Sequence, residues 1–182
     1  MKSRRISVLA MGVLAGGLLM TGCGPTTADD KGTTMSAEQI EASLRQKPSF
    51  EAAQAEYRSS VETMANQIAG LTPGTTWTFS DQTPWLSCGG DYIHTDAKHA
   101  YVSAGFEQPI PEAAWPQAVQ IVKDGAAKFG ATTLATFKDE PGNHDIAISG
   151  SDGVEFKLGT KVKASLTAQS DCRLSEMDSG TG

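Results

Sequence analysis

The first 23 residues constrain the fold more than any other stretch, because they determine how much of the chain is left to fold. Lys2, Arg4 and Arg5 make the N-terminus positive, and residues 6–20 follow as an apolar run without a charge. This run has the length of a signal-peptide core and is shorter than the roughly 20 residues of a membrane-spanning helix. We therefore expect residues 1–22 to be a cleaved signal peptide, which leaves 160 of the 182 residues.

The end of this segment, LLMTGC at residues 18–23, matches the lipobox that precedes the acylated cysteine of a bacterial lipoprotein. Thr21 and Gly22 are small, as the signal peptidase requires, whereas Met20 stands where leucine is more common. Each buried acyl CH₂ favours membrane residence by ~0.8 kcal/mol, so two or three chains on Cys23 would make a durable anchor. The alternatives are a secretory signal with a chance cysteine or an uncleaved anchor.

The charge of the chain excludes several classes of partner. The net charge is −6, and removal of residues 1–22 takes away three positive charges and no acid, so the remainder carries −9. An acidic domain does not favour nucleic acid or electrostatic adhesion to anionic lipid. We therefore expect acyl chains on Cys23 to hold the protein on the extracytoplasmic face of the cell membrane.

Assigning Cys23 to lipid leaves two cysteines, Cys88 and Cys172. In an exported protein such a pair predicts a disulfide. A cross-link over so long a loop would stabilise the fold by roughly 4 kcal/mol in the chain-entropy model. A catalytic thiol is the alternative, although the sequence contains no CxxC motif.

Apolar periodicity predicts three helices after a flexible tether at residues 23–35. Ser36 and Gln39 have the spacing of a capping box and open the first helix, which ends near residue 46. The second helix covers residues 49–69, and the third runs from residue 111 or 112 to 129, with Gly130 as its C-terminal cap. Pro116 predicts a kink, or a separate first turn, in the third helix.

Alternating segments predict the strands of the same domain, which spans residues 36–172. The expected strands are residues 76–80, 85–88, 100–106, 132–137, 145–149, 154–158 and 161–172. Gly159 and Thr160 are expected to form a two-residue hairpin turn, which places Val162 on the core face of the last strand. Residues 173–182 are expected to fray. The predicted fold class is α+β, a single domain with a largely antiparallel sheet and helices packed on one face.

The densest group of metal-binding residue types is Asp91, His94, Asp96 and His99. Imidazole and carboxylate groups suit Zn²⁺ or Mn²⁺. Their spacing matches no established metal motif, and Lys98 lies among them. We therefore expect a solvated loop and no resident metal or cofactor, and keep a metal-dependent or hydrolytic envelope enzyme as the alternative function. His144, beside Asp145 in an expected turn, is predicted to be a surface residue.

Three tryptophans, Trp77, Trp85 and Trp115, stand near the ends of predicted elements. Core packing around the disulfide is the simpler reading, and an aromatic-lined cleft for an apolar or sugar ligand is the functional one. The sequence contains no GxSxG motif and no phosphate-binding glycine loop, so we expect a non-enzymatic protein.

Several further features resemble one protein family. They are Trp77, Cys88-Gly89, the Ile110-Pro111-x-x-x-Trp115-Pro116 pattern, and the segment VKDGAAKFGAT at residues 122–132. Together they resemble the LppA-like lipoproteins of mycobacteria over roughly residues 40–172. The resemblance implies an envelope lipoprotein and brings no active-site residues. We expect such a protein to bind a small apolar ligand or an envelope protein.

Overall fold

The computed structural model describes residues 35–80 and 85–179, so the predicted signal peptide, Cys23 and all but the last residue of the predicted tether lie outside the described residues. The strands form one seven-stranded antiparallel sheet in the order β1-β3-β7-β6-β5-β4, and β2 also pairs with β3. The strands are β1 Trp77–Phe79, β2 Trp85–Ser87, β3 Lys98–Phe106, β4 Thr133–Glu140, β5 Asn143–Ser149, β6 Glu155–Thr160 and β7 Ala164–Arg173.

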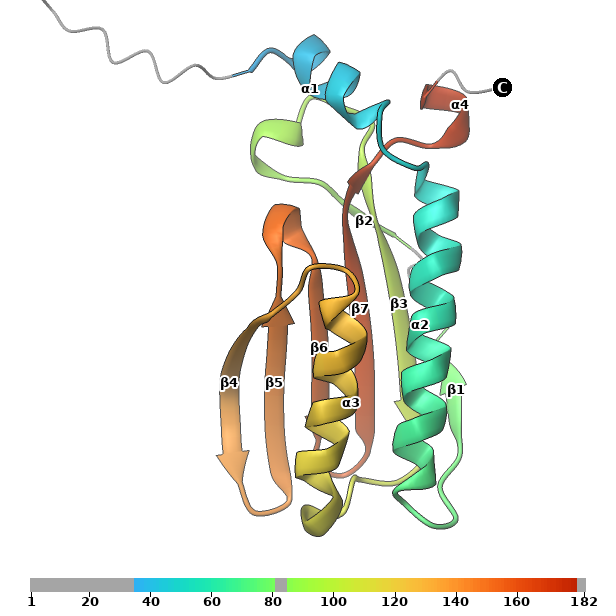
Figure 1. Ribbon diagram of the computed structural model, residues 1–182, viewed down its shortest axis with the longest axis vertical. Helices are drawn as coiled ribbons and strands as arrows, with labels where there is room; N and C mark the ends of the chain where they lie inside the picture. Colours follow the sequence, from blue (N-terminus) through green and yellow to red (C-terminus); the bar gives the residue numbers. More distant parts are fainter. Residues whose placement is uncertain (1–34, 81–84, 180–182) are drawn as a thin grey trace, which may run out of the picture. The chain divides into compact units, whose positions relative to one another are not determined.

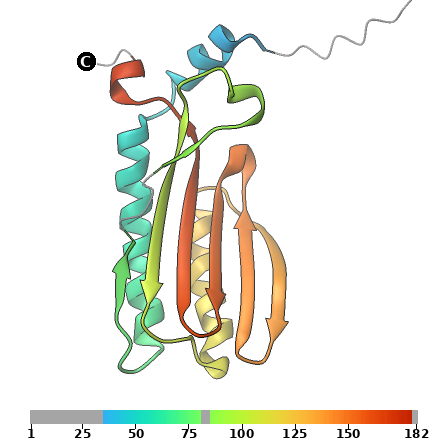
Figure 2. The same cartoon turned by 180° about the vertical axis from the view of Figure 1, so that it is seen from behind.

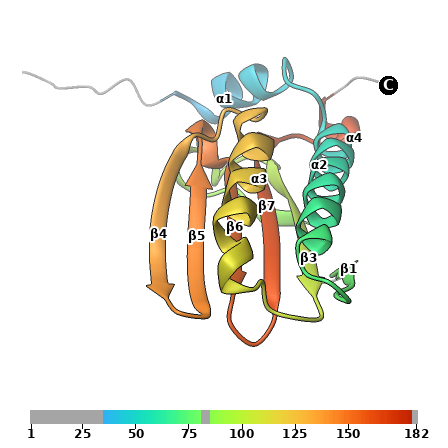
Figure 3. The same ribbon diagram turned by 60° about the horizontal axis from the view of Figure 1, so that its bottom comes forward.

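Two long helices cover one face of this sheet (Figures 1 and 3). They are α2, Phe50–Gly70, and α3, Trp115–Ala127. Seen from behind in Figure 2, the opposite face carries no helix in the described part of the chain. The α+β class and the helices on a single face are therefore confirmed.

The core lies between these helices and the covered face of the sheet. Along β3 and β7 nearly every second residue is buried, which is the pattern of a strand with one apolar face. Tyr57, Val61, Met64 and Ile68 form the buried stripe of α2, as their spacing predicts, and α3 contributes Trp115, Ala118, Val122 and Ala126.

The predicted start signals of the helices are present, and the observed helix ends differ from the predicted ends by one or two residues. Helix α1, Ala37–Leu44, begins with a complete capping box between Ser36 and Gln39. Ahead of Pro116, residues Glu112–Ala114 form a separate 3₁₀ turn (η2), and α3 begins at Trp115. Pro116 is tolerated at this helix start, because the N–H that proline lacks would have no partner there. Gly130 has a φ of 74°, the left-handed conformation expected of a C-terminal cap.

The predicted turn at Gly159 and Thr160 is wrong, because both residues belong to β6. Thr160 pairs with Ala164, and the turn consists of residues 161–163, where the Lys161 N–H donates to the Lys163 carbonyl at 3.1 Å. Thr160 stays buried because its hydroxyl accepts the Ile110 N–H at 2.9 Å. Val162 is consequently 80% exposed and does not face the core.

The prediction of a frayed tail is wrong for residues 173–179. Arg173 is the last residue of β7, and Glu176–Ser179 form the short helix α4. Leu174 is 2% exposed and joins a second apolar cluster, which we call the disulfide corner: Ile40, Leu44, Cys88, Ala97, Cys172 and Leu174. A single buried leucine produces no periodic signal, so the sequence pattern missed it.

Replacing Leu174 with alanine should lower the free energy of unfolding by about 2 to 4 kcal/mol, because it removes a fully buried side chain. Met177, three residues further on, is 92% exposed, so Met177→Ala should change it by less than about 0.5 kcal/mol. Urea denaturation of the two variants measures both values. Equal effects would show that the C-terminal segment does not pack as described.

Candidate functional site

The two helices on the sheet leave a groove between them, which we call the α2–α3 groove. Its volume is about 890 Å³. The lining residues are Glu56, Ser59, Ser60, Thr63, Met64, Gln67, Gly70 and Leu71 from α2 and its end, and Gln117, Ile121, Asp124, Gly125, Lys128 and Phe129 from α3 and its end. The groove therefore runs along both helices on the outer side of the core.

The floor of the groove depends on one close contact between the helices. A Cβ atom at Gly125 would lie 2.2 Å from the sulfur of Met64, so a larger residue there would require the Met64 side chain to shift. Both residues are buried. Further out, the walls hold partly exposed apolar side chains, Ile121, Leu71 and Phe129.

The rim of the groove is mostly neutral. Ser59, Ser60 and Thr63 supply hydroxyls from α2. Asp124 accepts a hydrogen bond from the Gln120 side chain at 2.7 Å. An apolar floor beneath a polar rim is the usual composition of a site for small apolar ligands.

The predicted disulfide is present. Cys88, directly after β2, is bonded to Cys172 near the end of β7, with their Cα atoms 6.1 Å apart. The bond joins segments 84 residues apart in the sequence and lies in the disulfide corner.

The candidate metal loop is divided between two environments. Asp91, His94 and Asp96 are exposed, around and after the 3₁₀ turn Gly90–Tyr92 (η1). His99 lies on β3 instead, and its ring is turned toward the disulfide, with Nε2 3.6 Å from the sulfur of Cys172. In the described part of the chain, the group close enough to hold a metal consists of Cys88, His99 and Cys172, without the loop carboxylates.

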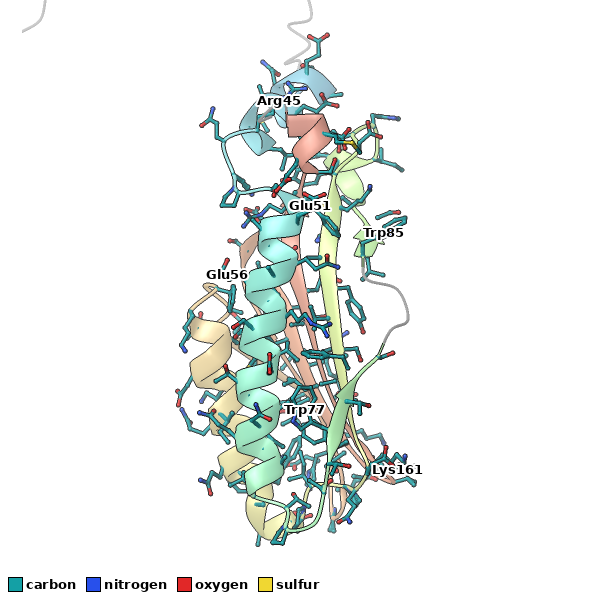
Figure 4. All side chains as sticks on the ribbon, turned by 90° about the vertical axis from the view of Figure 1, so that its right-hand side faces the viewer. Arg45, Glu51, Glu56, Trp77, Trp85 and Lys161 are labelled. Carbon is teal, nitrogen blue, oxygen red and sulfur yellow. A yellow bond between two sulfur atoms is a disulfide. The ribbon has the colours of Figure 1, made fainter. Side chains whose placement is uncertain are left out.

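The three tryptophans have separate sets of neighbours. Trp77 donates from Nε1 to Asn66 at 2.9 Å and contacts Phe79 edge-on. Trp85 is 43% exposed, with the ammonium of Lys98 5.5 Å from its ring, and Figure 4 shows it well apart from Trp77. Trp115 is 8% exposed and stacks on a histidine ring. These contacts give the hypothesis of a shared aromatic cleft no support.

That histidine is His144, and the prediction that it lies at the surface is wrong. It is 4% exposed, because β5 places it beneath the ring of Trp115, with ring centroids 4.8 Å apart. Its Nε2 is 3.0 Å from Glu112 and its Nδ1 is 3.0 Å from Asp139. Glu112 also accepts the Gly142 N–H at 2.8 Å. The trio of Glu112, Asp139 and His144 therefore ties the η2 turn before α3 to the β4–β5 hairpin.

Hydrogen bonding sets the pKa values in this trio. The bond to Glu112 is the largest cause that raises the pKa of His144, and the bond to Asp139 adds to it, while burial opposes both. The pKa of Glu112 is lowered, chiefly by the same bond and then by the Gly142 N–H. Both carboxylates therefore favour the protonated form of the His144 ring over the neutral one.

Sequence reasoning missed the α2–α3 groove and the His144 trio for different reasons. Gly125 occupies a core position of a predicted helix. A glycine at such a position indicates close packing against another element, so it could have predicted the contact between α2 and α3. The partners of His144 come from segments up to 32 residues away, and no local pattern brings them together.

Comparison with known proteins identifies relatives of the whole domain. A family model for LppA, described as "Lipoprotein confined to pathogenic Mycobacterium", matches residues 26–176. The protein named lipoprotein LppB of Mycobacterium tuberculosis strain H37Rv is 29% identical over 170 residues, which cover 86% of this chain and 75% of LppB. Lipoprotein LppA of that strain is 28% identical over 166 residues, with the same shares covered.

A solved structure resembles the fold described above. The crystal structure of lipoprotein LppA from M. tuberculosis superposes with a TM-score of 0.69 at 26% sequence identity, covering 78% of this chain and 87% of that chain. Within residues 35–80 and 85–179, no helix has the length and apolar character needed to cross a membrane.

The stability of the protein should depend on pH through His144. The pKa of His144 in the folded protein is raised above 6.5. The contribution of His144 to the free energy of unfolding is therefore complete below pH 6.5, and it is lost as the pH rises through the pKa of the folded protein. The pKa of Glu112 is lowered, so the contribution of Glu112 to the free energy of unfolding is complete above about pH 4.5. This contribution is lost as the pH falls through the pKa of Glu112 in the folded protein. The trio should therefore stabilise most between about pH 4.5 and 6.5.

Urea denaturation of the wild type and His144→Asn across pH 4 to 9 measures this dependence. The difference between the two free energies of unfolding should be greatest in that window and should shrink toward alkaline pH. His94→Asn, at an exposed position, is the matched control and should follow the wild type. Parallel profiles for wild type and His144→Asn would contradict the role of the trio.

Proposed function

Because the chain belongs to the LppA family of lipoproteins, we propose that it is a non-enzymatic envelope lipoprotein, anchored through an acylated Cys23, which binds an elongated apolar ligand in the α2–α3 groove. The family membership supports the anchor, since the relatives at 28–29% identity are also named lipoproteins. The lipobox at residues 18–23 supplies the cysteine that such an anchor requires.

The observation that carries the ligand proposal is the groove itself. Its volume of about 890 Å³ lies within the ordinary range of small-molecule sites, which is roughly 300–1,000 Å³. Met64 and Gly125 form a floor without charge, and Ile121 and Phe129 add apolar walls. An acyl chain needs this combination, because it gains free energy from apolar contact along its length.

The shape and charge of the groove narrow the ligand further. Its lining residues extend from Glu56 to Leu71 and from Gln117 to Phe129, along most of both helices, so it suits a long, thin ligand. Its charged residues are two acids, Glu56 and Asp124, and one base, Lys128. These three residues do not form the cluster of cations that a phosphate-rich ligand requires. The ligand class that best fits the groove is therefore the apolar portion of an envelope lipid.

Ser60 on the groove wall provides a direct test of this proposal. Ser60→Trp would fill the groove with an indole, whereas Glu62→Trp places the same indole on an exposed, non-lining position of α2. In the full chain carrying Cys23→Ser, the wild-type groove should bind the fluorescent fatty acid cis-parinaric acid. Ser60→Trp should weaken that binding at least about tenfold, which is about 1.4 kcal/mol, and Glu62→Trp should not.

Titration of the probe fluorescence gives the dissociation constants, and circular dichroism confirms that both variants are folded. A probe that does not bind, or that binds Ser60→Trp as tightly as the wild type, would refute a ligand site in the groove.

The anchor has a separate test. Expressed from its own signal peptide in a bacterial host, the wild-type chain should be recovered in the membrane fraction and take up labelled palmitate. Cys23→Ala should take up no label, because it lacks the thiol that carries the acyl chains. Uptake of label by Cys23→Ala would contradict acylation of this residue.

A further inference from the structure

The disulfide corner contains a histidine whose position is unusual beside a structural disulfide. On β3, His99 pairs with Cys172 on β7, and the sulfur of Cys172 lies 3.6 Å from Nε2 and 3.9 Å from Nδ1. One donor atom from each of Cys88, His99 and Cys172 lies within 4.8 Å of the other two. Two thiolates and an imidazole are among the commonest ligands of zinc in proteins.

The hydrogen bond on the far side of the ring determines which nitrogen can bind a metal. Nδ1 of His99 is 2.6 Å from the carbonyl oxygen of Ser170. A carbonyl only accepts, so Nδ1 carries the proton and Nε2 keeps the lone pair that can bind a metal. Zinc-binding histidines have the same arrangement, with the second ring nitrogen donating to a backbone carbonyl or a carboxylate.

The groups behind His99 are themselves held in place. Ser170 is fully buried, and its hydroxyl accepts the Ala100 N–H at 2.8 Å and donates to the Asp171 carbonyl at 2.7 Å. On the other side, a Cβ atom at Gly153 would lie 2.9 Å from Cε1 of the His99 ring. The ring is therefore enclosed by two backbone segments and keeps its orientation without the disulfide.

One distance also matches a tetrahedral zinc site. With Zn–N bonds of about 2.0–2.1 Å and Zn–S bonds of about 2.3 Å, a nitrogen and a sulfur ligand lie about 3.6 Å apart and two sulfurs about 3.8 Å apart. Nε2 of His99 already has the first separation from the sulfur of Cys172, although the 3.9 Å between that sulfur and Nδ1 places the sulfur over the ring and off the lone-pair axis of Nε2. Breaking the bond between the sulfurs frees both cysteine side chains to rotate, which allows the second separation and brings the Cys172 sulfur toward that axis.

We propose that reduction of the Cys88–Cys172 disulfide turns this cluster into a Zn²⁺ site, with both thiolates and Nε2 of His99 as ligands and solvent in the fourth position. The ion has access from the solvent side, because His99 is only half-buried. The site is distinct from the α2–α3 groove, so an experiment that refutes one proposal leaves the other unaffected.

The reductant is a dithiol, and the reaction balances as follows. One thiolate of the dithiol attacks the sulfur of Cys88, the more exposed of the pair, and the electron pair of the broken bond goes to Cys172. The second thiol then releases Cys88 by forming the cyclic disulfide of the reductant. Two electrons and two protons reach the cysteines, and Zn²⁺ displaces both protons when it binds.

Cobalt is a suitable probe, because Co²⁺ takes the tetrahedral place of zinc and its thiolate complexes absorb by charge transfer. The experiment uses the full chain with Cys23→Ser, so that Cys88 and Cys172 are its only thiols. After reduction with a phosphine, which has no thiol to compete for cobalt, the protein should bind one Co²⁺ with a thiolate charge-transfer band that Zn²⁺ abolishes. The oxidised protein should show neither.

His99→Gln should weaken cobalt binding by the reduced protein at least about tenfold, whereas His94→Gln in the exposed loop should leave it unchanged. Circular dichroism of both oxidised variants verifies the fold, and His99→Ala serves as a second variant. The proposal is overturned if the band is missing, if oxidised protein binds equally well, or if both histidine variants match the wild type. It also fails if the reduced protein unfolds and cobalt does not restore its circular dichroism.

Discussion

The burial of a single apolar face of the sheet beneath α2 and α3 is the constraint on which the other features depend. Alternate residues of β3, β7 and β6 supply that face, and two helices are enough to cover most of it. Removing apolar surface from water contributes roughly 25 cal/mol per Å², so the helices must lie close to the sheet and to each other. Gly125 and Met64 provide one point of close approach. The α2–α3 groove is what remains where the flanking side chains are too short to close the gap.

The same constraint explains how much of the fold could be predicted. A helix or strand with one buried face repeats its apolar residues at a fixed period, and that period is visible for Tyr57, Val61 and Met64 or for Ala164, Leu166 and Ala168. The helices, most of the strands and the α+β fold class could therefore be predicted from this apolar period. Capping signals such as Ser36 and Gln39 are equally local and were predicted correctly. The order of the strands was not predictable, because the pairing of β3 with β7 joins residues 60 to 75 positions apart.

Features that depend on a single contact across the fold were missed or wrongly predicted. Gly159 and Thr160 have the composition of a turn, yet the bond from Ile110 to the Thr160 hydroxyl keeps both residues in a strand. His144 follows a turn in the sequence, yet Trp115 and Glu112 approach it from another element. The disulfide was predictable because two cysteines remain once Cys23 is assigned to lipid, and this count does not require knowledge of the fold. The orientation of His99 toward that disulfide was not, since it depends on the register between β3 and β7.

The separation of the two apolar clusters bears on whether the reduced protein can keep its fold. The main core between the helices and the sheet contains neither cysteine, and the disulfide corner is a small cluster in which α1, β7 and the residues before α4 meet. Loss of the cross-link removes entropic stabilisation from the whole chain, but it breaks no contact in the main core. The pairing of His99 with Cys172 belongs to the β3–β7 ladder, and the Ser170 carbonyl that orients the ring is held by backbone and hydroxyl groups. The orientation of the His99 ring therefore rests on interactions that do not involve the S–S bond, and bound metal would replace the lost cross-link between the same two segments.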